Sequence, residues 1–159
     1  MAKFTDDGLD GLMLSLQELA ELPDDVEEEM LDDAARVVVG AHRRQLRALG
    51  LWDPGNAGEH LVDSITAHKK VETVDGVRKR SVLIYPTGKR AGSKTIRRGR
   101  KGRAKPVEQN DVGFVHEFGA PKRGIPAKNW MQKANDLCAP DVEKAEFEVY
   151  DRWAQSKDL

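Results

Sequence analysis

The residues able to do chemistry in this 159-residue chain are scattered rather than grouped. The sequence contains four histidines and one cysteine, namely His42, His60, His68, His116 and Cys138. None of them stands at a spacing typical of a zinc site. A phosphate-binding glycine loop, a dinucleotide-binding fingerprint and a nucleophile elbow are also missing from the sequence. We therefore expect no catalytic, cofactor-binding or metal-binding residues and no enzyme activity.

The adjacent pair His116-Glu117 is the best remaining candidate for acid–base chemistry. It falls within residues 111–118, whose pattern predicts a β-strand, and neighbouring side chains of a strand point to opposite faces. The two groups therefore cannot hold one reacting atom together. We interpret the segment instead as a structural corner, formed by Glu117, Phe118, Gly119, Pro126 and Trp130. Here Glu117 bonds to backbone amides or to a basic neighbour, Gly119 permits a sharp exit, and Pro126 opens a helix.

Charge is segregated along the chain, although the net charge is only −1. Residues 24–33 hold seven acids and no base, and we expect them to form a solvated helix face that complements the helix dipole. Residues 89–105 hold nine bases and no acid: Lys89, Arg90, Lys94, Arg97, Arg98, Arg100, Lys101, Arg103 and Lys105. This basic segment is interspersed with glycine and has a single large aliphatic residue. It therefore predicts a long mobile loop.

Apolar periodicity predicts helices at both ends of the chain. Residues 9–21 predict a short amphipathic helix, and residues 23–49 predict a second helix of about 40 Å. The C-terminal helical region contains Pro140, which we expect to kink it or to start a new turn. Beyond Pro140, one face of the final helix is apolar, with Val142, Ala145, Val149 and Trp153.

Two strands are predicted between these helices. Residues 61–74 contain many β-branched residues, residues 77–86 end in the apolar run Val82–Tyr85, and the tight-turn pair Asp75-Gly76 joins the two segments. We therefore expect one α+β domain over residues 1–159, with a long N-terminal helix and a C-terminal helix packed on a small antiparallel sheet.

Two segments of the chain resemble one known family. The segment HEFGAPKRGIPAKNWMQKA resembles the (V/H)E(F/Y)GT…(G)IPARPFLRPA signature of the tail-component family of long-tailed bacteriophages, the gene-product-ten-like tail-completion and head–tail joining proteins. Its matching positions are His116, Glu117, Phe118, Gly119, Ile125, Pro126, Ala127, Trp130, Met131 and Ala134. Upstream, DPGNAGEHLVDSI resembles the family's P(V)(D)TG.LR.SI, with Pro54, Gly58, Leu61, Ser64 and Ile65 in place. The two motifs occur in the family's order, and the resemblance spans roughly residues 9–150.

The chain departs from the family pattern at three places. Ala120 replaces the threonine after the corner glycine, and Lys128-Asn129-Trp130 replaces Arg-Pro-Phe. In the upstream motif, Ala57-Gly58 replaces Thr-Gly.

The resemblance implies a non-enzymatic virion structural protein of the phage neck, acting in tail completion or head–tail joining. Such proteins form rings at the junction between the tail and the head connector. The implied partners are further copies of the chain, the connector or head-closure protein, and the tail-tube or tail-terminator protein. The implied location is the virion, after assembly in the host cytoplasm. No membrane partner is expected, because no apolar run approaches the roughly 18–20 residues that span a bilayer.

Residues 89–105 allow three interpretations. We place first an assembly contact, in which this basic segment meets the acidic helix half of an adjacent copy and the ring closes through that contact. Second is nucleic-acid binding, including DNA in the ring lumen, because nine bases could follow a phosphate backbone. No aromatic residue is interleaved for base stacking, however. Third is a solvated loop with no partner.

Overall fold

Helices and one long β-hairpin make up the described part of the protein. The structure is a computed structural model, and it describes residues 22–51, 61–89, 97–98, 104–105 and 107–157. The helices are α2 (Asp24–Ala48), α3 (Gln109–Phe118), the 3₁₀ turn η1 (Pro121–Arg123) and α4 (Trp130–Ser156); the strands are β1 (Ile65–Val74), β2 (Val77–Pro86), β3 (Arg97–Arg98) and β4 (Ala104–Lys105). The expected α+β fold class is confirmed. The helix expected at residues 9–21 lies outside the described residues.

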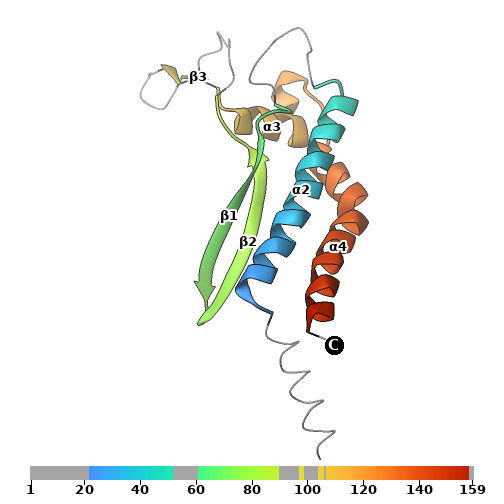
Figure 1. Ribbon diagram of the computed structural model, residues 1–159. Helices are drawn as coiled ribbons and strands as arrows, with labels where there is room; N and C mark the ends of the chain where they lie inside the picture. The colour runs from blue at the N-terminus through green and yellow to red at the C-terminus, as the bar shows by residue number, and fades with distance from the viewer. Residues whose placement is uncertain (1–21, 52–60, 90–96, 99–103, 106, 158–159) are drawn as a thin grey trace, which may run out of the picture.

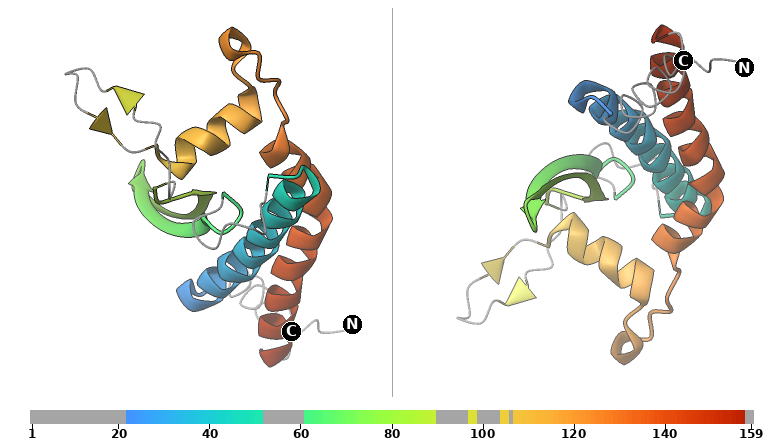
Figure 2. Two further views of the ribbon diagram at one scale, coloured as in Figure 1. Left: turned by 90° about the horizontal axis from the view of Figure 1, so that it is seen from above. Right: turned by 90° about the horizontal axis from the view of Figure 1, so that it is seen from below.

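Helix α2 is the central element of the fold, with the β1–β2 hairpin on one side and α4 on the other (Figure 1). The views from above and below show the same order (Figure 2). Helix α4 runs antiparallel to α2, and Arg152 near its end donates a hydrogen bond to Glu29 near the start of α2 at 2.9 Å. Helix α3 contacts both β2 and α4. It therefore links the hairpin to the helix pair.

Helix α2 forms where its sequence predicts a helix. Pro23 occupies the N-cap position, and Asp24, Asp25 and Glu27 lie in the first turn, where acids complement the helix dipole. The 25 residues span about 37 Å. Small buried residues allow α4 to approach closely, since Ala41 of α2 packs with Ala134 and Cys138 of α4.

The predicted hairpin is also confirmed. Asp75 and Gly76 have φ angles of 54° and 80°, and a two-residue turn with both central φ angles positive matches the twist of the strands. Pairing runs from Ile65 opposite Pro86 to Val74 opposite Val77. The strand begins later than predicted, because residues 61–64 form a turn in which Ser64 Oγ donates a hydrogen bond to the carbonyl of Leu61 at 2.8 Å.

The predicted strand at residues 111–118 is wrong, because this segment is helix α3. Gly113 and Glu117, four residues apart, are both buried, whereas Phe114 and Phe118 are both exposed. That spacing of buried positions follows a helical period and not the alternation of a strand. The buried side of α3 meets Trp130 and the start of α4, so contacts with a distant segment select the helix.

Helix α4 begins at Trp130 and not, as predicted, at Pro126. The residues just before it are tied to the end of α3, since the N–H of Lys128 donates to the carbonyl of His116 at 2.8 Å and that of Asn129 to the carbonyl of Glu117 at 3.1 Å. These bonds hold the segment outside the helix. From Trp130 the helix continues through Pro140 to Ser156.

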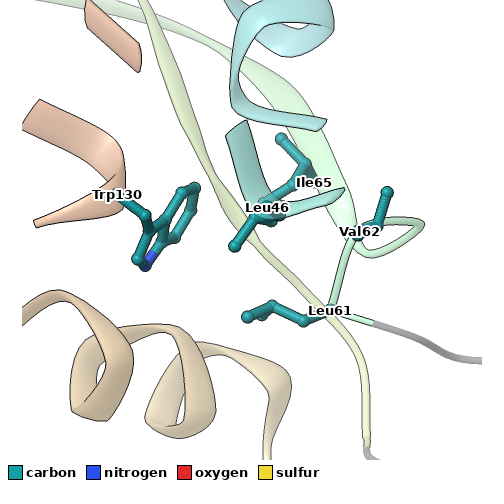
Figure 3. Packing of buried hydrophobic residues seen from close by; sticks show 5 residues of the cluster. All are labelled: Leu46, Leu61, Val62, Ile65 and Trp130. Carbon is teal, nitrogen blue, oxygen red and sulfur yellow. The ribbon is translucent and has the colours of Figure 1, made fainter. Parts of the chain in front are cut away.

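The main core lies where α2, the start of the hairpin and the start of α4 meet. It consists of Leu46, Leu61, Val62, Ile65 and Trp130, all buried (Figure 3). A second, smaller cluster between α2 and α4 joins Ala41, Ala134 and Cys138. The larger hydrophobic cluster therefore lies at the end of the α2–α4 pair that is next to α3.

Candidate assembly surfaces

The corner predicted from the sequence is built around the Glu117 carboxylate. Its Oε2 accepts a hydrogen bond from the N–H of Met131 at 2.7 Å, and its Oε1 accepts one from the N–H of Gln132 at 3.3 Å. Glu117 is only 5% exposed. The interpretation that this carboxylate bonds to nearby backbone amides is confirmed. Both of its oxygens are used in holding the first turn of α4.

Gly119 makes the sharp exit from α3 possible. Its φ is 76°, and a Cβ at this position would lie 2.7 Å from the backbone N of Ala127 and 2.8 Å from the carbonyl oxygen of Ile125. Ala120 and Ile125 then pair as an isolated β-bridge and close the loop over η1. Only a glycine fits this position without moving the backbone.

The two segments that carry the family resemblance meet in the main core. Leu61 and Ile65 of the upstream motif pack with Trp130 of the downstream motif (Figure 3). The Trp130 indole N–H donates to the carbonyl of Gly113 at 3.0 Å. A Cβ on Gly113 would lie 3.5 Å from both Leu61 and Trp130. Residues about 70 positions apart in the sequence therefore form one structural unit.

The structure places only part of the basic segment. Lys89 is exposed, and its backbone bridges to Glu108. Strands β3 and β4 pair with Arg97 opposite Lys105 and Arg98 opposite Ala104. Arg90, Lys94, Arg100, Lys101 and Arg103 lie outside the described residues. Lys89 therefore lies at the start of α3, and strand β3 lies beyond the end of β2 (Figure 1).

The acids of α2 have partners within the same chain, while the side chains of Asp24, Glu27, Glu28 and Asp32 stay 40% to 69% exposed, as expected of a solvated face. Arg80 of β2 binds both Asp24 and Glu27, the latter at 2.6 Å. Lys69 of β1 binds Glu28 at 3.1 Å and Asp32 at 2.9 Å. The sequence showed the acids, but the hairpin bases that meet them lie 37 to 56 positions further along the chain. These ion pairs hold the hairpin against α2.

Large apolar side chains are exposed on several elements. The exposed residues are Val71, Val74 and Leu83 on the hairpin, Phe114 and Phe118 on α3, and Leu137 and Phe147 on α4. The rings of Phe114 and Phe118 lie 4.7 Å apart and form one exposed aromatic pair. Exposed apolar groups of this size that gather together mark surfaces that bind other proteins.

An open groove of about 630 Å³ lies between α2 and β1. Ala35, Val39 and Ile65 give it an apolar floor, and Arg36 and Arg43 add positive charge. Arg43 Nη2 donates to the carbonyl of Ile65 at 3.0 Å. Among the described strands, β1 pairs with β2 alone, so its other edge has no strand partner within the described residues. An open strand edge is a second type of surface on which chains associate.

His42 was not singled out by the sequence, yet it lies buried between α2 and α4. Its Nε2 is 2.8 Å from Oδ1 of Asn135. The centroids of the His42 and Trp130 rings are 5.3 Å apart, and the two ring planes are nearly perpendicular. Burial lowers the pKa of His42, although the hydrogen bond to Asn135 and the nearby Glu117 oppose this shift. The only signal in the sequence was its place beside the apolar positions of α2.

The described ranges show little that could support bound-metal or thiol chemistry. Among these residues, no three His, Cys, Asp or Glu side chains are placed to hold a metal ion. Cys138 is buried, and burial raises the pKa of its thiol. No helix within the described ranges is long and apolar enough to cross a membrane.

Comparisons of this chain with protein-family models, with curated proteins and with solved structures found no match. The relation to the phage tail-component family therefore stays a prediction from the two motifs.

Proposed function

We propose that this protein is a non-enzymatic structural protein of the phage neck, which completes the tail or joins it to the head by forming a ring at the tail–connector junction. The observation that carries the proposal is the meeting of the two family-like motifs at Leu61, Ile65 and Trp130. Two motifs that belong to one fold are expected to share a core. The contact between the two motifs in one core therefore supports the proposal that both belong to the same family fold.

The surface of the protein also suits assembly. Exposed apolar residues occur on the hairpin, on α3 and on α4, so more than one side of the molecule can contact a neighbour. A ring subunit needs two different contact surfaces, because each copy binds one neighbour on each side. Ion pairs of Lys69 and Arg80 with α2 connect the hairpin to the helix pair.

A stop codon in this gene tests the proposal. Electron microscopy of the resulting phage lysate is expected to show filled heads beside separate tails. Overlong tails would indicate that the protein terminates tail polymerisation, and tails of normal length would indicate that it completes or joins them. Intact particles joined at the normal frequency would contradict a neck function.

A second candidate function is nucleic-acid binding by the basic segment. The backbone pairing of Arg97 with Lys105 in β3 and β4 favours it, because two basic positions of the segment then stand opposite each other. The affinity of such binding falls steeply as the salt concentration rises. The slope of the logarithm of the binding constant against the logarithm of the salt concentration is proportional to the number of phosphates neutralised. Titration of the protein into duplex DNA at several salt concentrations measures that slope. Charge reversal of Arg97, Arg98 and Arg100 is expected to reduce it, whereas an unchanged slope would contradict DNA contact by this segment.

A further inference from the structure

Helix α4 has one side that is both acidic and partly apolar. Ala134, Cys138, Val149 and Trp153 are buried on the side facing α2. At 100° per residue the opposite side carries what we call the α4 outer face: Lys133, Asp136, Leu137, Glu143, Lys144, Phe147 and Glu148, with Asp141 at its border, all exposed. Leu137 is 72% exposed and Phe147 is 63% exposed. Four acids and two lysines thus surround two large apolar side chains.

The acids of the α4 outer face differ from those of α2 in having few partners. Lys144 lies 3.8 Å from Glu148. Within the described part of the chain, Asp136, Asp141 and Glu143 form no ion pair. The acids of α2, in contrast, are paired with Lys69, Arg78 and Arg80 of the hairpin. Among the described residues 24–33, Asp25 is the one acid without an ion pair, so a positively charged partner finds more unpaired carboxylates on α4 than on α2.

We propose that the α4 outer face is the docking site for the basic segment, residues 89–105, of a second copy of this chain. This proposal rests on the proposed ring assembly, and it identifies the surfaces through which neighbouring copies in the ring would bind each other. Complementary charge is the main argument, since the segment holds nine bases and no acid. Guanidinium groups bind carboxylates through paired hydrogen bonds, and they also stack on aromatic rings such as that of Phe147.

The position of the two surfaces explains why the partner is a second copy. Strands β3 and β4 lie on the side of the hairpin away from α4, and α2 stands between the hairpin and α4 (Figure 2). The two complementary surfaces of one chain therefore face different directions. Contact between different surfaces of successive copies is head-to-tail, and such contacts close into a ring when the rotation per copy allows it.

A binding experiment on the full-length protein tests this contact. A synthetic peptide of residues 89–105 is titrated into the isotope-labelled protein and followed by NMR at low salt. We expect the amide signals of Leu137, Glu143 and Phe147 to shift and those of the acidic half of α2 to stay. Shifts centred on α2, or no shifts at any residue, would overturn the proposal.

Two double variants separate a specific site from a general charge effect. Asp141→Lys with Glu143→Lys changes the α4 outer face, and Asp63→Lys with Glu72→Lys makes the same change in net charge at exposed positions outside both long helices. We expect the first pair to weaken peptide binding about tenfold and the second to have little effect. Equal weakening by both pairs would mean that the peptide responds to net charge alone, and it would overturn the site.

The result is independent of the stop-codon experiment. If the peptide binds α4 but particles lacking the protein still join normally, the contact stands and the neck function fails. If joining fails but the peptide does not bind α4, the neck function stands and this contact is wrong.

Discussion

Glu117 and Met131 are joined by a 2.7 Å hydrogen bond from the Met131 backbone N–H to the Glu117 carboxylate, which ties the end of α3 to the first turn of α4. The first amides of a helix have no partner within the helix and need an acceptor. Asn129, at the N-cap position of α4, makes no side-chain hydrogen bond to them. A carboxylate from the preceding helix takes the place of a local cap, and its negative charge complements the helix dipole.

Replacing Glu117 is therefore expected to destabilise the whole protein. Glu117→Ala removes the acceptor for two backbone amides in a buried site, and we expect a loss of about 2 kcal/mol in the free energy of unfolding. Glu117→Gln keeps one acceptor oxygen and is expected to lose less. Urea unfolding followed by circular dichroism measures both. The control is Glu143→Ala on the exposed side of α4, and a Glu117→Ala variant as stable as this control would contradict the capping role.

Two glycines on helices are expected to respond in opposite directions to alanine. A Cβ on Gly113 would lie 2.8 Å from Cγ of Pro86, so Gly113→Ala overpacks the core and is expected to cost roughly 1–3 kcal/mol. A Cβ on Gly40 would meet only the flexible end of Arg44 at 3.4 Å. Gly40→Ala is therefore expected to gain about 0.5–1 kcal/mol from helix propensity. Thermal unfolding of both variants checks this, and a stabilised Gly113→Ala protein would show that α3 is not packed as described.

The bases of the hairpin are expected to contribute unequally to stability. The Arg80 side chain is 9% exposed and contacts two acids of α2, whereas the Arg78 side chain is 59% exposed and contacts Asp24 alone. The Asp24 and Glu27 carboxylates raise the pKa of Arg80, which stays charged at any working pH. We expect Arg80→Met to lower the melting temperature more than Arg78→Met, and the gap to shrink in high salt, where exposed acids are screened. Equal melting temperatures of the two variants at low salt would contradict the larger contribution of Arg80 to stability.

Local signals in the sequence predicted the parts of the fold that local chemistry decides. The hairpin follows from Asp75-Gly76, because this pair accepts the positive φ angles that the turn requires. Helix α2 follows from its period and from the acids of its first turn. The corner glycine, Gly119, was also identified correctly, since its position between two elements is a local feature.

The errors came where distant residues decide the structure. Residues 111–118 alternate like a strand, and only the packing of Gly113 and Glu117 on the start of α4 shows why they form a helix. The partners of the acids on α2 were missed for the same reason, because Lys69 and Arg80 meet them only after the hairpin folds back. The candidate assembly surface on α4 needed the structure as well, since exposure of Leu137 and Phe147 cannot be read from their types.

His42 is expected to make stability depend on pH. Burial between α2 and α4 lowers its pKa below the ordinary value, against the opposing effects of Asn135 and Glu117. The unfolded chain therefore binds a proton at His42 more readily than the folded protein does. The contribution of neutral His42 to the free energy of unfolding is fully present above about pH 6.5. It decreases as the pH falls below this value toward the folded pKa, because protonation then favours the unfolded state.

Urea unfolding between about pH 5 and 8 measures this pH dependence, because the ordinary histidine pKa lies within that range. His42→Gln is expected to flatten the pH dependence in this range, even if it also lowers stability at every pH. His68→Gln serves as the matched control, because His68 lies on the hairpin, where it stacks on Tyr85 at 4.5 Å and has no part in the α2–α4 interface. If the slope disappears in the His68 variant and persists in the His42 variant, the proton that destabilises the fold binds at the hairpin, and the buried imidazole between the two long helices is not the sensitive group.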